Sequence, residues 1–282
     1  MKINANAKIN LSLDVTKKRD DGYHEVFMIL QEIDLCDVLD VSLTTDGEIK
    51  LMCDGLNDTP SCDNLAYKAA RLFLDTLESK NGCNIVLKKN IPVGAGLAGG
   101  STDAAAVLKA LNSLFNEPFD TQKLKELGLK LGADVPFCID GGTKLAEGIG
   151  EKLTDISGMK PLWAALIKPT KSISTKEAYN KIDSSVFEHP DVMKAKKHIE
   201  NGDMQGLFEC MGNVFESAAK DEIPEIEDIK THFVSKGALF SMMSGSGPTV
   251  FGLFDNKESA QKALESFEGI CESKHVARLI TK

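Results

Sequence analysis

The fold is decided by residues 84–103, which read NIVLKKNIPVGAGLAGGSTD. Residues 84–89 are rich in apolar and β-branched side chains and predict a strand. A glycine-rich loop follows at residues 94–100. The triplet at residues 101–103 is typical of a helix N-cap, and we expect a helix over residues 104–114. A strand, a glycine-rich loop and a helix N-terminus therefore follow one another without interruption.

This loop has the features of an anion-binding site. Glycine lets backbone N–H groups approach a phosphate closely, and a helix N-terminus adds about half a positive charge from its dipole. The segment supplies both features in succession, which favours a nucleotide phosphate as the ligand. The alternative is a glycine-rich turn that serves only close packing of the helix.

The loop also matches the pattern G-x-G-x-x-G of dinucleotide-binding proteins, at Gly94, Gly96 and Gly99. Such a site needs an acidic residue about 20 positions further on, at the end of the next strand. Glu117 and Asp120 lie near that distance, but in a loop between two expected helices. A P-loop is excluded because no Gly-Lys-[Ser/Thr] follows, and a protein kinase because its glycine-rich loop joins two strands. A dinucleotide-dependent oxidoreductase remains a distant alternative.

Strands are expected on the N-terminal side of the loop. Residues 3–15 alternate between apolar and polar side chains, which predicts a long, half-buried strand with Lys8, Asn10 and Ser12 in a row on its other face. Further elements are expected at residues 26–33, 38–43 and 49–53, as strands separated by turns, and at residues 63–77, as a helix.

A second domain is expected on the C-terminal side of the loop. A helix at residues 121–131 leads to Asp134, which stands at a bend just before a proline. Beyond about residue 155, and apart from extra helices between residues 175 and 235, the predicted order is β-α-β-β-α-β, the split-βαβ order. We therefore predict an α+β protein with two domains. Residues 1–155 would hold the phosphate loop, and residues 156–282 a ferredoxin-like sheet.

Composition and charge narrow the classes of partner. The 282 residues are 42% hydrophobic and 27% charged, as in ordinary folded proteins. The formal net charge of -9 opposes approach to nucleic acid or to an anionic membrane, so we expect a small-molecule substrate. The seven cysteines lack metal-ligand spacing, and no metal site is predicted. No signal peptide is recognisable, which favours a cytoplasmic protein. Its oligomeric state is left open between a monomer and a weak homodimer.

Three segments together resemble the motifs of the GHMP kinases, the superfamily of galactokinase, homoserine kinase, mevalonate kinase and phosphomevalonate kinase. They are residues 7–11 (AKINL), 92–102 (PVGAGLAGGST) and 244–249 (SGSGPT). Their order and their spread along the chain make the match more specific than any one motif. The resemblance implies a two-domain kinase fold whose glycine-rich loop wraps the triphosphate of ATP, with Mg²⁺ as the companion of ATP.

Further segments resemble one branch of this superfamily. They are residues 22–24 (GYH), 131–137 (LGADVPF) and 146–151 (AEGIGE). The resemblance implies transfer of the ATP γ-phosphoryl group to the 2-hydroxyl of a cytidine diphosphate-linked methylerythritol in isoprenoid synthesis. A homoserine or mevalonate kinase, and a nucleotide-binding sensor without catalytic activity, remain as alternatives.

The resemblance assigns catalytic roles to Asp134 and Lys8. Asp134 corresponds to the family's catalytic aspartate and would accept the proton of the hydroxyl group. Lys8 would lie beside it and stabilise the developing charge. Taken alone, a lysine on the polar face of a strand is usually solvated, and an aspartate before a proline is usually a cap or turn residue.

The resemblance also implies residues that bind the acceptor substrate. Asn10 and His24 would hydrogen-bond to it, His24 at the cytosine edge. Tyr23 and Tyr179 would sandwich the cytosine ring, since stacking on an aromatic side chain contributes about 1–3 kcal/mol per base. A core position is the alternative for Tyr179, and Thr175 would line the same pocket.

The expected ATP site is the glycine-rich loop with two further residues. Asn64 and Lys89 align with nucleotide-binding positions of the family, although Lys89 would otherwise be an ordinary exposed lysine of a strand. The turn of Gly245, Ser246 and Gly247 would close on the acceptor or the phosphates with its backbone N–H groups. The loop residues are Pro92, Val93, Gly94, Ala95, Gly96, Leu97, Ala98, Gly99, Gly100, Ser101 and Thr102.

Overall fold

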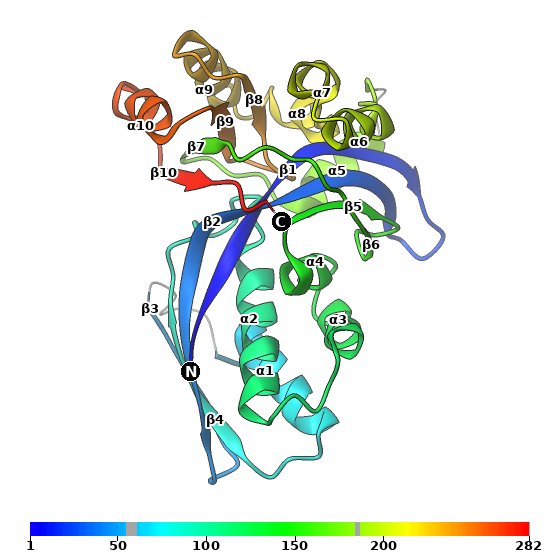
Figure 1. Ribbon diagram of the computed structural model, residues 1–282, viewed down its shortest axis with the longest axis vertical. Coiled ribbons are helices and arrows are strands. Elements are labelled where there is room, and N and C mark those ends of the chain that lie inside the picture. Colours follow the sequence, from blue (N-terminus) through cyan, green and yellow to red (C-terminus); the bar gives the residue numbers. More distant parts are fainter. Residues whose placement is uncertain (55–60, 184–186, 282) are drawn as a thin grey trace. The chain divides into compact units, whose positions relative to one another are not determined.

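The computed structural model describes residues 1–54, 61–183 and 187–281, and it divides into two units of strands and helices (Figure 1). Unit 1 comprises Met1–Ala7, Cys36–Val93 and Ala98–Gly141. Unit 2 comprises Lys8–Leu35, Gly94–Leu97 and Gly142–Lys282. The α+β class is confirmed. Each unit combines segments from different parts of the chain, and the division of the sequence at residue 155 stays a prediction.

Strand β1 (Lys2–Lys18) confirms the strand that the alternating pattern predicts. The prediction that it is half-buried is wrong, because every residue from 7 to 15 is buried, including the polar ones. The polar row of Lys8, Asn10 and Ser12 therefore needs hydrogen-bond partners inside the protein, since a buried polar group without one costs free energy.

Strand β2 (His24–Thr44) is continuous where the sequence predicts two strands and a turn. Two aspartates near its middle remain in the strand because backbone N–H groups bind them. The N–H group of Arg278 donates to Asp34 at 2.6 Å, and that of Ile91 donates to Asp37 at 2.8 Å. These partners lie far away in the sequence. The residues next to the aspartates therefore suggest a turn and give no sign of the hydrogen bonds.

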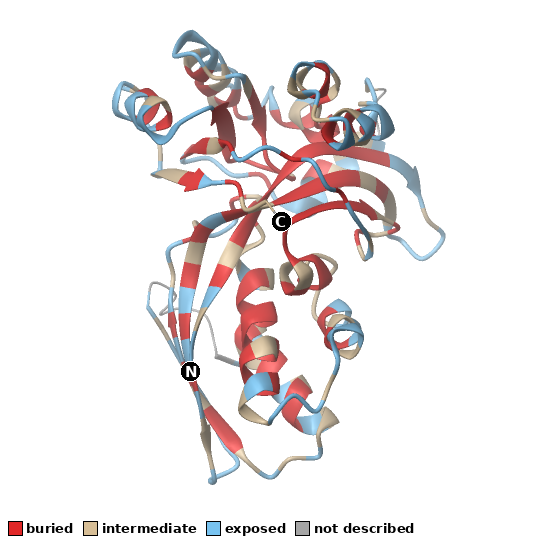
Figure 2. Ribbon diagram, in the orientation of Figure 1, coloured by how far each residue is buried: buried red, intermediate tan, exposed pale blue. Residues whose placement is uncertain are grey.

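Unit 1 places helices on one face of a small sheet (Figure 1). In it, β4 pairs antiparallel with the second half of β2 and parallel with β3. Helices α1 and α2 pack against each other, and each buries several alanines. Figure 2 shows α2 buried along most of its length. The elements are β3 (Ile49–Asp54), α1 (Leu65–Thr76), β4 (Gly82–Lys88), α2 (Gly99–Leu114), α3 (Thr121–Leu129) and α4 (Val135–Asp140).

Helix α2 begins at Gly99, earlier than the sequence predicts. Residues 101–103 lie in its first turns, so the prediction that they form the N-cap is wrong. The hydroxyl group of Thr102 donates to the carbonyl oxygen of Gly99 at 2.9 Å, and the carboxylate of Asp103 accepts a hydrogen bond from Lys89. Thr102 therefore bonds within the helix and Asp103 belongs to a charged network, and neither caps the helix.

Unit 2 contains a 4-stranded antiparallel sheet in the order β10-β7-β9-β8. The element order around it confirms the predicted ferredoxin-like, split-βαβ arrangement. Helices α5 to α8 are inserted between β7 and α9, and β5 pairs with the first half of β2 and with β6. The elements are β5 (Thr143–Glu147), β6 (Lys152–Asp155), β7 (Trp163–Lys168), α5 (Thr175–Asp183), α6 (Val192–Glu200), α7 (Met204–Cys210), α8 (Val214–Ala219), α9 (Glu225–Ser235), β8 (Phe240–Met243), β9 (Val250–Phe254), α10 (Lys257–Glu265) and β10 (Ser273–Arg278).

Candidate functional site

The buried lysine of β1 binds the tip of the glycine-rich loop within unit 2. Lys8 and Asn10 are only 5% and 1% exposed. The ammonium group of Lys8 donates to Asn10 Oδ1 at 2.7 Å and to the carbonyl oxygen of Gly96 at 2.9 Å. Its backbone N–H group donates to the carbonyl oxygen of Leu97 at 3.2 Å. A solvated Lys8 is therefore excluded, and its charge is held at a fixed place beside the loop.

The turn at residues 244–247 meets the same loop tip. Ser244 Oγ accepts a hydrogen bond from the N–H group of Asn10 at 3.3 Å and donates one to the carbonyl oxygen of Gly96 at 3.1 Å. Gly96 has a φ of +75°, and a Cβ added to it would lie 2.1 Å from the carbonyl oxygen of Ser244. Only glycine fits there. The three segments that resemble the GHMP motifs thus meet within unit 2.

Asn213, which the sequence reasoning does not single out, holds this turn. Its Nδ2 group donates to the carbonyl oxygens of Met243 and Gly245, each at 2.8 Å. Its Oδ1 atom accepts from the N–H group of Phe215 at 3.0 Å and so caps α8. An asparagine before a helix is a signal for a cap. The two donated bonds connect segments that are distant in the sequence, and no local pattern predicts them.

Replacement of Asn213 by aspartate is expected to lower the free energy of unfolding by about 1–3 kcal/mol, because a carboxylate oxygen would face two carbonyl oxygens that lose their donor. The cap of α8 would remain. Asn256 caps α10 in the same way at an exposed position, so Asn256→Asp is the matched control and should change stability little. Urea unfolding of both variants checks this, and equal losses would contradict the role of Asn213.

Two of the expected acceptor-binding residues are in ring contact within unit 2. The rings of His24 and Tyr179 stack with centroids 4.5 Å apart, and Phe215 meets Tyr179 edge-on at 4.9 Å. Tyr23 is 59% exposed. The sandwich of a cytosine ring between Tyr23 and Tyr179 stays a prediction. Thr175 contacts the turn of residues 245–247, which is also expected to bind the acceptor or the phosphates. Its Oγ1 atom lies 3.0 Å from Ser246 Oγ.

The imidazole of His24 is oriented by a carboxylate. Asp183 Oδ1 lies 2.8 Å from His24 Nε2, and Lys18 also donates to this carboxylate. The hydrogen bonds from Lys18 and His24 lower the pKa of Asp183, which keeps it ionised near neutral pH. Because an ionised carboxylate only accepts hydrogen bonds, the proton of a neutral His24 ring stands on Nε2 and its Nδ1 atom is an acceptor.

The two residues that flank Gly96 are buried, whereas residues further along the loop are exposed. Ala95 and Leu97 are 3% and 1% exposed, while Val93 is 57% exposed. Gly94 and Gly100 are also exposed. The buried pair thus fixes the loop, and Gly94 and Gly100 remain accessible. At the start of α2 the first N–H groups have no partner within the helix, which suits them to bind an anion.

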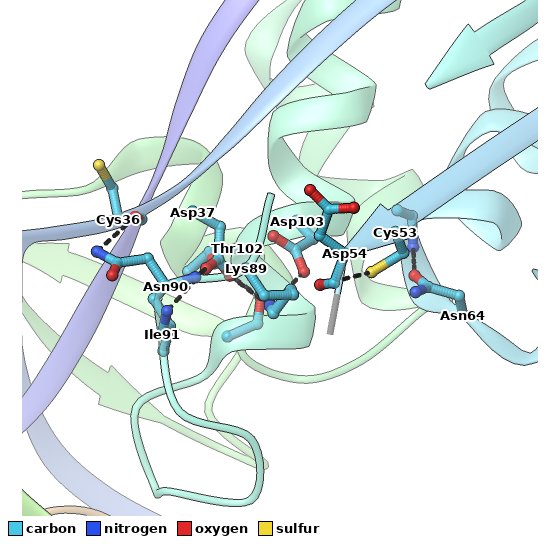
Figure 3. A network of polar contacts seen from close by, with 12 residues as sticks. Cys36, Asp37, Cys53, Asp54, Asn64, Lys89, Asn90, Ile91, Thr102 and Asp103 are labelled. Atoms are coloured by element: carbon cyan, nitrogen blue, oxygen red, sulfur yellow. Dashed lines mark hydrogen bonds and ion pairs between the residues drawn. The ribbon is translucent and has the colours of Figure 1, made fainter. Parts of the chain in front are cut away.

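The two further residues expected at ATP both lie in unit 1 (Figure 3). Asn64 caps α1, since its Oδ1 atom accepts from the N–H group of Ala66 at 2.9 Å. Lys89 is not an ordinary exposed lysine. Its side chain is 10% exposed and donates to Asp37 and Asp103. That their role is to bind ATP stays a prediction.

Asp134 lies at the N-terminus of α4, and its side chain makes no capping hydrogen bond to that helix. Its carboxylate is therefore not used by the backbone of its own helix, as a cap residue would be. Asp134 belongs to unit 1 and Lys8 to unit 2, and the pairing of the two side chains stays a prediction.

Among residues 1–54, 61–183 and 187–281, no three His, Cys, Asp or Glu side chains are grouped so that they could hold a metal ion. In the same ranges no helix has both the length and the apolar character needed to cross a membrane.

Comparison with known proteins places this chain in a family. Residues 64–142 match the model of the GHMP kinases N terminal domain, and residues 195–272 match that of the GHMP kinases C terminal domain. The protein called 4-diphosphocytidyl-2-C-methyl-D-erythritol kinase is 46% identical in Clostridium novyi (strain NT), over 98% of this chain and 99% of the relative. In Clostridium botulinum (strain Alaska E43 / Type E3) it is 48% identical, over 100% and 99%.

A solved structure agrees with these relatives. The crystal structure of a 4-(cytidine 5'-diphospho)-2C-methyl-D-erythritol kinase superposes with a TM-score of 0.84 at 32% identity, and the match covers 99% of both chains. The chain therefore belongs to the GHMP kinases, which are ATP-dependent small-molecule kinases, and within them to the 4-diphosphocytidyl-2-C-methyl-D-erythritol kinases.

Proposed function

We propose that the protein transfers the γ-phosphoryl group of ATP to the 2-hydroxyl group of 4-diphosphocytidyl-2-C-methyl-D-erythritol, in the non-mevalonate route to isoprenoid precursors. We further propose that it acts in the cytoplasm as a monomer or a weak homodimer. Relatives named for this substrate match the chain over nearly its whole length. The observation that carries the proposal is the meeting of Lys8, Gly96 and Ser244, because it joins the three kinase motifs in one place.

In the proposed reaction Asp134 acts as the base. The oxygen of the acceptor hydroxyl forms a bond to the γ-phosphorus atom, its proton passes to the Asp134 carboxylate, and the bond from that phosphorus to the β-phosphate oxygen breaks. ADP leaves with the electron pair of that bond. Phosphoryl transfer depends mainly on in-line positioning and on neutralising charge. Lys8 would supply a fixed positive charge, since Asn10 and Gly96 already hold its ammonium group in place.

The proposed ATP site is the glycine-rich loop, residues 92–102, with the N-terminus of α2 for the phosphates and with Asn64 and Lys89. Mg²⁺ would enter with ATP and neutralise charge on the β- and γ-phosphates. Mg²⁺ often keeps several water ligands and is held through substrate phosphates with one or two carboxylates. A dedicated cluster of protein carboxylates is therefore not required for it.

The proposed acceptor site uses Asn10, His24, Tyr23, Tyr179 and Thr175 with the turn of residues 245–247. Cytosine presents an amino group that donates and a ring nitrogen that accepts. The Nδ1 acceptor of His24 suits the amino group, given that Asp183 holds the proton on Nε2. Tyr23 is exposed and offers a ring face on which a base could stack.

The proposal is tested by measuring ADP release with ATP, Mg²⁺ and each of three acceptors, namely 4-diphosphocytidyl-2-C-methyl-D-erythritol, homoserine and mevalonate. We expect turnover with the cytidylyl acceptor alone. Turnover on homoserine or mevalonate would assign the chain to another kinase activity. If ATP binds but no acceptor is phosphorylated, the assignment fails and a nucleotide sensor becomes the better interpretation.

A further inference from the structure

Three buried charged side chains in unit 1 form one network (Figure 3). The side chains of Asp37, Lys89 and Asp103 are 0%, 10% and 3% exposed. The ammonium group of Lys89 donates to Asp37 Oδ2 and, at 2.7 Å, to Asp103 Oδ2. The three residues come from β2, from the position directly after β4 and from the first turns of α2. The network therefore joins a strand to both sides of the glycine-rich loop.

The network binds the chain at each end of that loop. Before the loop, Asp37 Oδ1 accepts hydrogen bonds from the backbone N–H groups of Asn90 and Ile91. After the loop, Asp103 ties the start of α2 to the same ammonium group. A Cβ added to Gly99 would lie 3.1 Å from Ile91 Cγ2 and 3.5 Å from Lys89 Nζ, so the two ends of the loop are in close contact here.

The charges of the network do not balance when all three groups are ionised, because two carboxylates face one ammonium group. Burial lowers the pKa of Lys89, but the two carboxylates outweigh it and raise that pKa above its usual value. Burial raises the pKa of Asp103 to about 7, against the opposing effect of Lys89. Asp103 Oδ1 is buried and has no hydrogen-bond partner among the described residues. A proton on Asp103 would make the network neutral.

We propose that Asp37, Lys89 and Asp103 are positioning residues that hold the two ends of the glycine-rich loop in the conformation that binds ATP. The proposal deepens the proposed function and rests on it for the identity of the nucleotide. Buried ion pairs are weak contributors to stability, because desolvation offsets their attraction. A network of this kind that serves only the fold could be replaced by apolar side chains without a change in nucleotide binding.

The test replaces Lys89 by methionine and compares it with Lys88→Met. Lys88 is the last residue of β4, directly before Lys89, and it is exposed. Its replacement therefore removes the same charge from the opposite face of the chain. We expect Lys89→Met to weaken ATP binding about tenfold or more, because the two ends of the loop lose the ammonium group that joins Asp37 to Asp103. The KM for the acceptor should change by less than about twofold, because the network affects binding of the nucleotide and not of the acceptor. Lys88→Met should alter neither quantity.

Asp103→Asn is the second variant, and it decides the matter if Lys89→Met does not fold. It removes the surplus negative charge and keeps an oxygen that can accept from Lys89. The titratable groups around Asp103 are Asp37 and Lys89, with Cys53 and Asp54 of β3 nearby. We expect the ATP affinity of Asp103→Asn to fall below that of the unchanged protein as pH rises through 7, because the ionised Asp103 then holds the ammonium group of Lys89 by a charged hydrogen bond that an amide oxygen makes more weakly. Comparing the two proteins at each pH cancels the titration of the nucleotide.

The outcomes separate this proposal from the proposed function. ATP affinity is measured by calorimetry without any acceptor, so it does not depend on which substrate is phosphorylated. A folded Lys89→Met variant that binds ATP as Lys88→Met does would overturn the positioning role, and so would parallel pH profiles for Asp103→Asn and the unchanged protein. Failure of the unchanged protein to phosphorylate the cytidylyl acceptor would overturn the proposed function instead.

Discussion

Replacement of Asp134 by asparagine is expected to lower kcat by about 10²- to 10⁴-fold, the usual contribution of a positioned general base. Asparagine has the shape of aspartate but cannot take the proton of the acceptor hydroxyl. Because the side chain of Asp134 does not cap α4, the variant should keep its stability. ATP binding should also be unchanged, so the loss should appear in kcat and not in the affinity for the nucleotide. Initial rates of ADP release with saturating substrates give the measurement.

Asp140→Asn is the matched control for this experiment. Asp140 ends the same helix, and Lys125 donates to its carboxylate at 3.2 Å. Its replacement removes one negative charge from α4 without touching the proposed base. A drop in kcat of similar size in both variants would show that the charge of the helix matters and not the proton acceptor. An Asp134→Asn enzyme with nearly full activity would remove Asp134 from the mechanism.

Replacement of Gly96 by alanine is expected to reduce kcat/KM for ATP by about 10²-fold, since a displacement of about 1 Å at a reacting group can have that effect. The new Cβ would lie 2.1 Å from the carbonyl oxygen of Ser244, which belongs to the backbone and cannot turn away. The loop tip must therefore move, and its hydrogen bonds from Lys8 and Ser244 would lengthen or break. Stability should fall as well, and thermal unfolding without nucleotide measures that loss.

Gly94→Ala separates the clash from the strain of the backbone. Gly94 has a φ of +61°, and nothing lies within 4 Å of a Cβ added to it. It therefore carries the conformational cost of alanine at positive φ, about 1–2 kcal/mol, without the contact. We expect Gly96→Ala to lose clearly more stability than Gly94→Ala. Equal losses would mean that the contact with Ser244 does not constrain the loop.

The sequence predicts the elements around the loop better than their surroundings. The strand, the glycines and the helix are local patterns, and each is confirmed. The start of α2 is not, because Ser-Thr-Asp is typical of a cap, whereas Asp103 is bound by Lys89. Only the folded chain brings that partner to it. From the neighbouring residues alone, capping is the only role that can be predicted for this aspartate.

The same reason explains the errors on the two long strands. Alternation in β1 predicts one solvated face, but Lys8 and Asn10 are buried because Gly96 and Ser244 supply their partners. The aspartates of β2 suggest a turn and stay in the strand because distant N–H groups bind them. In each case a polar residue is satisfied by a segment far away in the chain. The expected catalytic residues came from the family resemblance, since periodicity alone would have left Lys8 solvated.

The carbonyl oxygen of Gly96 takes both of its hydrogen bonds from the protein itself, from Lys8 and from Ser244. The tip of the loop thus loses its conformational entropy when the chain folds and not when a nucleotide arrives. Association with ATP should then be fast and follow a single kinetic phase, because a preorganised site needs no slow rearrangement after the encounter.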